Sequence, residues 1–231
     1  MHLKFSPNRL YNLFNSLTYD QFVTKVLHKV FPKNNSVIKS QKLLKFDRTP
    51  FRLASVGMIF HPRQNSPHII IEHRSSDVPR HPNEMALPGG AYDPSVDSNL
   101  FDTFARECQE EIDVPKKLLE AHSHLRFETT TTQFMVLPIV CSSKRKNLRL
   151  KPDLYEIAKI SSVPIADLVL TAKVNQSVPL FPDCNEFDLP VSHGWSFKLV
   201  KGSNQRQHLI WGLTANIIAQ FCSQVDKHFF H

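Results

Sequence analysis

The chain has 231 residues, of which 41% are hydrophobic and 21% charged, which is typical of a globular domain with an extension and predicts a packed core. The sequence contains no internal repeat, no secretory signal pattern and no apolar run near the ~20 residues that a membrane-spanning helix needs. Residues 1–48 carry nine Lys and Arg and two acids, hence the whole net charge of +7, so the charge excludes a basic nucleic-acid-binding body.

The basic N-terminal segment, residues 1–48, allows two interpretations. Apolar residues recur at near-helical spacing from Leu3 to Leu17, and no acid precedes Asp20. An amphipathic, basic and acid-poor segment is typical of a mitochondrial transit peptide. Because the apolar pattern continues beyond a short presequence, one or two helices over residues 3–30 that pack on the domain are equally favoured.

The following segment predicts a linker and then strands. Residues 31–40 are expected to form the linker. The sequence favours strands at residues 51–60 and 68–74, joined by a turn at Pro62–Pro67, and a short strand at residues 84–87 before the glycines.

A helix is predicted over residues 98–112, with Asp97 as its N-cap and Pro115 beyond its end. β-branched and aromatic residues then indicate further strands. The remaining expectations are one or two strands in 125–143, a basic loop at 143–151, a helix near Ile165–Leu170 and a closing helix at 209–225.

Strands and helices alternate here without a regular βαβ order, so the predicted fold class is α/β, with a mixed β-sheet between helices. The expected organisation is an N-terminal extension at residues 1–48, a domain at residues 49–225 and a tail at residues 226–231.

The four cysteines are too sparse for a disulfide framework and include no C-x-x-C pair. We expect buried, reduced thiols in an intracellular protein, which is mitochondrial or cytoplasmic. The chain ends in Phe-Phe-His, which is not a peroxisomal signal. The cysteines are Cys108, Cys141, Cys184 and Cys222.

Three glutamates share one sector of the helix predicted at residues 98–112. At about 100° per residue, Glu107, Glu110 and Glu111 lie within about 100° of one another. Like charges this close repel each other, and a hard divalent cation such as Mg²⁺ or Mn²⁺ would relieve the repulsion. A solvated acidic face is the alternative that this run alone allows. The adjacent apolar face contains Phe101, Phe104, Ala105, Cys108 and Ile112.

The stretch from Gly90 to Val114 resembles the box of the Nudix hydrolases, G-x5-E-x7-R-E-U-x-E-E-x-G-U, where U is a bulky apolar residue. Sixteen positions separate Gly90 from Arg106, where the box has fourteen. Ser98 stands in place of the first box glutamate, and Asp113 in place of the late glycine. The matching residues are Gly90, Arg106, Glu107, Cys108, Glu110, Glu111 and Val114.

The coenzyme A diphosphatase branch of this family is similar in having a longer loop after the glycines. Asp93-Pro94 and the run from Thr103 to Glu107 resemble that branch. One extra residue near Val96 aligns Asp97 with the loop aspartate of the branch. Upstream, Arg74, Ser75, Pro88, Gly89 and Gly90 keep the spacing of its signature, whereas Pro79, Asn83 and Leu87 depart from it.

The resemblance, which spans about residues 51–222, implies an α/β/α sandwich and metal-dependent hydrolysis of a nucleoside diphosphate derivative. Glu107, Glu111, Glu110 and the Gly90 backbone are the implied ligands of Mg²⁺ or Mn²⁺. Glu110 is alternatively the group that accepts the proton of the attacking water. Arg106 is expected to orient a box carboxylate.

Further candidates lie outside the box. Glu156 and Glu84 are additional acidic candidates, with a helix-start glutamate as the plain alternative for Glu156. Arg74, Arg80 and His81 are candidate substrate contacts; a strand-end ion pair or a loop hydrogen bond would explain Arg74 and His81 equally well. Arg80 and the loop of Lys144, Arg145 and Lys146 are candidates for a substrate 3′-phosphate.

The expected partner is a small nucleotide, with no nucleic acid and no membrane span. Coenzyme A or acyl-coenzyme A is the leading candidate substrate, and its hydrolysis would give 3′,5′-ADP and 4′-phosphopantetheine. ADP-ribose or a dinucleotide is the second possibility. Ser98 and Asp113 motivate a third possibility, a binding module without turnover. An RNA-binding role of the basic N-terminus is the least favoured hypothesis. We expect Asp113 to mark an altered helix end in left-handed geometry.

Overall fold

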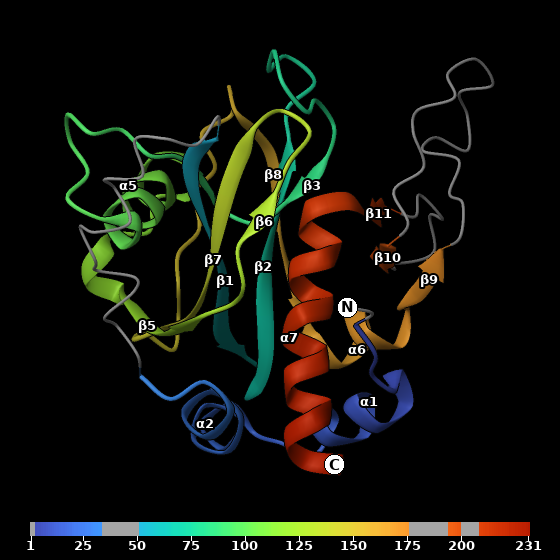
Figure 1. The fold of residues 1–231 in the computed structure, drawn as a ribbon. Helices are drawn as coiled ribbons and strands as arrows, with labels where there is room; N and C mark the ends of the chain where they lie inside the picture. The colour runs from blue at the N-terminus through green and yellow to red at the C-terminus, as the bar shows by residue number, and fades with distance from the viewer. Residues whose placement is uncertain (1–2, 34–50, 176–193, 200–207) are drawn as a thin grey trace.

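A mixed β-sheet lies between two helical layers in the computed structural model, which describes residues 3–33, 51–175, 194–199 and 208–231 (Figure 1). Most of the predicted linker and Cys184 lie outside these residues. The predicted α/β/α sandwich is confirmed. Within the described chain, no helix combines the length and the apolar character needed to cross a bilayer.

The main sheet is ordered β3-β2-β1-β7-β5, with β4 pairing to β1, β6 to β7 and β8 to β2. β1 and β7 run parallel, whereas the other pairs are antiparallel, so the sheet is mixed as predicted. Its strands are β1 (Arg52–Arg63), β2 (Ser66–Arg74), β3 (Met85–Ala86), β4 (Gly89–Ala91), β5 (Leu119–His124), β6 (Glu128–Thr129), β7 (Phe134–Ser143) and β8 (Ile157–Pro164).

A smaller antiparallel sheet has the order β11-β10-β9. This sheet precedes the closing helix in the sequence. The helix was predicted to begin at residue 209 and begins at Gly212. Its strands are β9 (Lys173–Asn175), β10 (Gly194–Leu199) and β11 (His208–Ile210).

Helix α5 (Leu100–Ile112) covers one face of the main sheet, and α7 (Gly212–Phe230) covers the other (Figure 1). Alternation along the strands separates two cores: Ile59 and Ile70 pack towards α5, whereas Phe60 and Ile71 pack towards α7. The α7 side also contains α1 (Pro7–Asn15), α2 (Tyr19–Phe22), a π-helical turn (Val23–Leu27), α3 (His28–Val30) and α6 (Ile165–Leu170). A 3₁₀ turn (Lys116–Leu118) follows α5.

The N-terminal helices are part of the core on the α7 side. Phe14 and Phe22 are fully buried. The ring of Phe22 lies 5.0 Å from that of Phe60, and the ring of Phe31 lies 5.0 Å from that of Phe221. This is the packing that a folded extension requires, because aromatic rings at such distances contribute both buried area and specific geometry.

Several element boundaries differ from the predictions. The β1–β2 turn is tighter than expected, because Pro62 pairs with Pro67 and only Gln64 and Asn65 form the loop. Both loop residues have positive φ, 50° and 61°, which matches the twist of a two-residue hairpin. β5 was not predicted, and residues 226–230 continue α7 instead of forming a tail.

The cap of α5 was also predicted wrongly. The N-cap is Asn99, whose side chain accepts hydrogen bonds from the backbone N–H groups of Phe101 and Asp102. At the other end, Asp113 has φ 58° and ψ 36°, which confirms the predicted left-handed helix end. The described cysteines, Cys108, Cys141 and Cys222, are buried free thiols, as expected.

Candidate functional site

The glycine turn and the glutamates of α5 meet at one place. β4 pairs with the first half of β1, with Gly90 opposite Ser55. The N–H of Gly89 donates a 3.0 Å hydrogen bond to Oε2 of Glu111. A Cβ atom at Gly90 would lie 2.4 Å from Oε1 of Glu107, so only glycine leaves room for this carboxylate. The turn therefore holds two of the three helix glutamates against its backbone.

Arg106 connects this helix to the long loop before it. Its Nε and Nη2 each donate a 3.1 Å hydrogen bond to the carboxylate of Asp97, and Nη2 also donates to the carbonyl of Ala91. Its Nη1 lies 3.0 Å from Oε1 of Glu107 and 2.9 Å from Oε2 of Glu110. Asp97 is thus the carboxylate that the loop supplies, and it is an ion-pair partner of Arg106, not a helix cap.

The pKa of Asp97 reflects two opposing causes. Burial alone would raise it, but hydrogen bonds from Arg106 and from the backbone of Asp93 bring the pKa below its ordinary value. The same ion pair raises the pKa of Arg106. Neighbouring Ser98, which stands at the position of the first box glutamate, is exposed.

The three glutamates occupy different environments. Glu111 is 3% exposed, Glu107 is half-buried and Glu110 is exposed. Burial raises the pKa of Glu107 and of Glu111 above the ordinary value for a glutamate. Nη1 of Arg74, at the end of β2, lies 3.7 Å from Oε1 of Glu111. The structure therefore places Arg74 beside the glutamates in a strand-end ion pair, the alternative that the sequence allowed, and turns Glu110 towards the surface.

Glu72, which the sequence analysis did not single out, belongs to the same neighbourhood. It lies on β2, is fully buried, and neither carboxylate oxygen has a hydrogen-bond partner among the described residues. Burial, followed by the charge of Glu111, raises its pKa well above the ordinary value. A glutamate directly after the three isoleucines of β2 was the available signal, because acids are rarely buried without a partner.

Glu156 is half-buried and also stands near these carboxylates. Its backbone carbonyl accepts a 2.8 Å hydrogen bond from the N–H of Ser75, directly after β2. Its charge contributes to the raised pKa values of Glu72, Glu107 and Glu111.

The other predicted contacts lie outside this cluster. Arg80 and His81 are exposed, and Nδ1 of His81 lies 3.1 Å from Oε1 of Glu84. Glu84 is thus the hydrogen-bond partner of His81. The basic loop is placed elsewhere: Lys146 lies 4.0 Å from Asp20, beside the β1–β2 turn. The structure does not bring that loop to the glutamates.

The donor set fits a hard divalent cation. Among the described residues, no three His, Cys, Asp or Glu side chains are already gathered as a metal cluster, and Arg74 and Arg106 form ion pairs with Glu111 and Glu107. The two partnerless oxygens of Glu72 and the buried carboxyl group of Glu111 are nevertheless oxygen groups of the kind that Mg²⁺ and Mn²⁺ prefer as ligands.

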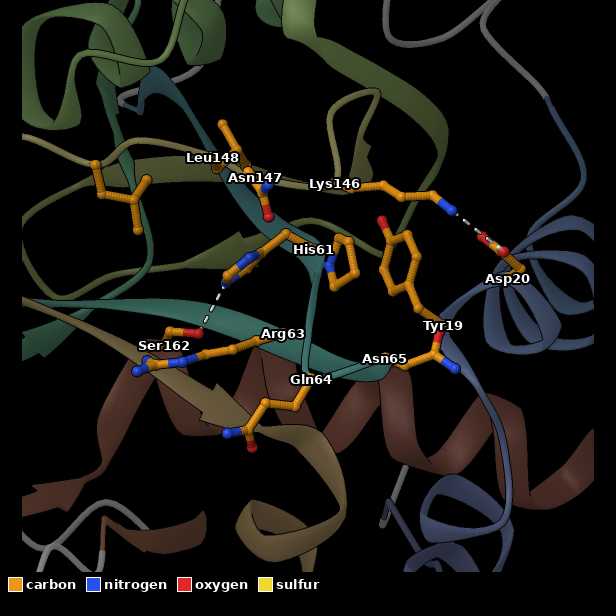
Figure 2. A pocket seen from close by; sticks show the side chains of 12 residues that line it. Tyr19, Asp20, His61, Arg63, Gln64, Asn65, Lys146, Asn147, Leu148 and Ser162 are labelled. Atoms are coloured by element: carbon orange, nitrogen blue, oxygen red, sulfur yellow. Dashed lines mark hydrogen bonds and ion pairs between the residues drawn. The ribbon is translucent and has the colours of Figure 1, made fainter.

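An open hollow of about 510 Å³ lies at the opposite end of the β1–β2 hairpin (Figure 2). Its lining includes Arg63, eight residues along β1 from Ser55, which corresponds to about 26 Å along a strand. Some of its polar groups have partners: Nε2 of His61 is 2.9 Å from the Ser162 hydroxyl group, and the Tyr19 hydroxyl group donates to a backbone carbonyl. No box glutamate lines it, so the glutamate cluster remains the candidate site.

Comparisons with known proteins agree with the sequence resemblance, although no family model matches the chain. The chain is 30% identical over 160 residues to the uncharacterized Nudix hydrolase NudL of Photorhabdus laumondii, covering 69% of this chain and 78% of the relative. It is 27% identical over 169 residues to NudL of Enterobacter sp. (strain 638), covering 71% and 78%.

Solved structures give weaker likenesses. An ADP-ribose pyrophosphatase from Streptococcus suis is 15% identical with a TM-score of 0.43, covering 79% of this chain and 96% of that one. An Ap4A hydrolase from C. elegans is 17% identical with a TM-score of 0.42, covering 49% and 81%. The sequence relatives carry the assignment: the chain belongs to the Nudix hydrolase family.

Proposed function

We propose that this protein hydrolyses the diphosphate bond of a nucleoside diphosphate derivative with Mg²⁺ or Mn²⁺, and that coenzyme A or acyl-coenzyme A is the substrate. The products would be 3′,5′-ADP and 4′-phosphopantetheine or its acyl form. The observation that carries the proposal is the contact of half-buried Glu107 and buried Glu111 with the glycine turn, where the backbone approaches both carboxylates closely.

The residues of the site have distinct proposed roles. Glu107, Glu111, Glu110 and the backbone of Gly90 would hold the cation, which supplies charge neutralisation and a more acidic water. Arg106 holds Glu107 in position, because Asp97 fixes its guanidinium group from the other side. These contacts preorganise the carboxylates before substrate binds.

The reaction itself needs a proton acceptor and a cation for the substrate. Water would attack one phosphorus, the bridging P–O bond would break, and a carboxylate would take the proton of the water. Glu110 and Glu156 are the candidate acceptors. Arg74 is the described cation beside Glu111 and would contact a phosphate of the substrate. Arg80 and His81, further along the chain, are the other candidate substrate contacts.

Two alternatives rest on specific residues. Pro79, Asn83 and Leu87 depart from the coenzyme A signature, which favours ADP-ribose or a dinucleotide as the second candidate substrate class. A binding module without turnover was motivated by Ser98 and Asp113. The Asp97–Arg106 ion pair and the exposed left-handed position of Asp113 weigh against it, because neither departure removes a carboxylate from the cluster.

A substrate panel tests the proposal. Purified full-length protein is incubated with Mg²⁺ or Mn²⁺ and, separately, with coenzyme A, acetyl-coenzyme A, ADP-ribose and a dinucleoside polyphosphate. Release of phosphopantetheine at the highest kcat/KM in the panel is the expected result. Faster hydrolysis of ADP-ribose than of coenzyme A would assign the protein to the second substrate class. Binding without turnover of any diphosphate would overturn the proposed hydrolase activity.

A further inference from the structure

The carboxyl group of Glu72 is the least compensated polar group near the candidate site. The side chain is fully buried in β2, and neither of its oxygens has a hydrogen-bond partner among the described residues. Burying a polar group without a partner is unfavourable, and burying a charge without one is more unfavourable still. A buried carboxyl group in this condition therefore indicates a missing partner.

The surroundings of Glu72 offer no such partner. The residues opposite it on the neighbouring strands are Ala86 of β3 and Ile160 of β8. Both are apolar. Arg74 lies two positions further along the same face of β2 and its charge acts on Glu72, but its ion pair is with Glu111 and it makes no hydrogen bond to Glu72.

The position of Glu72 directs it to the side of the sheet that carries the site. Ile70, two positions earlier, packs into the core beneath α5, and the alternation of a strand places Glu72 on this same face. Glu111 and Glu107 of α5 both act electrostatically on Glu72, and Glu72 acts on the buried Cys108 of the same helix. Thus one strand carboxyl group faces the helix that carries the proposed metal ligands.

We propose that Glu72 is an additional, strand-borne carboxylate of the divalent cation site, and that the cation is the partner its two oxygens lack. The inference rests on the proposed function. Glu72 lies on β2, eighteen positions before Gly90, and is not among the residues that match the Nudix box or its upstream signature. It would hold the cation from the sheet side, whereas Glu107 and Glu111 hold it from the helix.

Binding of Mn²⁺ alone tests this role without any substrate. Free Mn²⁺ is titrated against the full-length wild-type protein and Glu72→Gln by electron paramagnetic resonance, and the thermal midpoint is recorded with and without Mn²⁺. Glu72→Gln is expected to weaken Mn²⁺ binding at least tenfold and to reduce the Mn²⁺-induced rise of the midpoint. Asp20→Asn, which removes an exposed carboxylate from the hollow of Figure 2, is the matched control and should bind Mn²⁺ as the wild type does.

The outcomes separate this inference from the proposed function. If the wild type and Asp20→Asn bind Mn²⁺ and Glu72→Gln, correctly folded, binds it equally well, Glu72 is an ordinary buried acid and the inference is wrong. If the wild type itself binds no Mn²⁺, the proposed function fails first. Glu72→Met provides a second variant of similar shape: it should be at least as stable as the wild type without metal, and gain less from Mn²⁺. An undiminished gain would overturn the inference.

Discussion

The guanidinium group of Arg106 donates two hydrogen bonds, each 3.1 Å long, to the carboxylate of Asp97, nine positions earlier in the chain. From the same group, Nη1 reaches Glu107 and Glu110. Arg106 thus connects the long loop to the acidic face of α5 through ion pairs. The loop departs from the family spacing, yet it still delivers one buried carboxylate to this arginine.

Replacing this carboxylate should weaken both stability and catalysis. Asp97→Asn keeps the size of the side chain but leaves Arg106 with one neutral acceptor in a partly buried position. We expect the free energy of unfolding to fall by roughly 1–3 kcal/mol and kcat/KM to fall about 10-fold or more, because Arg106 no longer holds Glu107. Urea denaturation and steady-state kinetics measure the two effects. Ser98→Ala, at the exposed neighbouring position, is the control, and equal losses in both variants would contradict this role of Asp97.

The two glycines should respond differently to alanine. At Gly90 the added Cβ meets the flexible end of Glu107 at 2.4 Å, whereas at Gly89 it meets the backbone oxygen of Ser55 at 2.2 Å with φ at +140°. Gly90→Ala is therefore expected to fold near wild-type stability but lose about 10–100-fold in kcat, because a displaced ligand misplaces the reacting groups. Gly89→Ala should lose roughly 1–3 kcal/mol of stability. Denaturation and kinetic measurements on both variants distinguish these effects, and a reversed order would show that the turn is described wrongly.

Acid should destabilise the protein through two buried histidines. Burial lowers the pKa of His61 and of His122 to about 4, from an ordinary value of 6.5. Between these values the unfolded chain binds protons that the folded chain does not. Stability is therefore lost as the pH falls from about 6.5 to about 4, by on the order of 1–3 kcal/mol per histidine.

The urea midpoint at pH 7 and at pH 4.5 measures this loss. His61→Gln and His122→Gln should each flatten the pH dependence, and comparison with the wild type at both pH values separates their effect from that of the carboxyl groups. His81→Gln, at an exposed loop position, should keep the wild-type dependence. A pH dependence that is identical in all four proteins would rule out these histidines as its cause.

The N-terminal helices are expected to be needed for folding. Phe22 is fully buried and its ring lies 5.0 Å from that of Phe60. Phe22→Ala should lower the free energy of unfolding by about 3–5 kcal/mol, and deletion of residues 1–33 should lower it further. Thermal and urea denaturation measure both. A deleted chain with an unchanged midpoint would show that the segment is dispensable, as a cleaved transit peptide would be.

The helix of the site was predictable because its periodicity is strong. The apolar face from Phe101 to Ile112 and the left-handed end at Asp113 follow from helical geometry and from the conformations that aspartate tolerates. The N-cap was not, because Asp97, Ser98 and Asn99 are all good capping residues and only the tertiary ion pair with Arg106 decides among them.

The role of Glu72 and the position of the basic loop depend on tertiary contacts. The strand pattern of β2 places Glu72 on one face, but the helix that covers this face is known only from the fold. In the same way, the charges of Lys144–Lys146 gave no indication that the parallel pairing of β1 with β7 carries them to the hairpin end. β5 was missed because its alternation of polar and apolar residues is weak.

We propose that Glu107 helps to hold the cation that activates diphosphate hydrolysis. Its most direct test is the rate of phosphopantetheine release from coenzyme A by the wild type and by Glu107→Gln, each with saturating Mn²⁺ and each verified as folded by circular dichroism. We expect metal-dependent release by the wild type and a kcat lowered by on the order of 10²–10³ or more in the variant. Release at an undiminished rate by Glu107→Gln would contradict it.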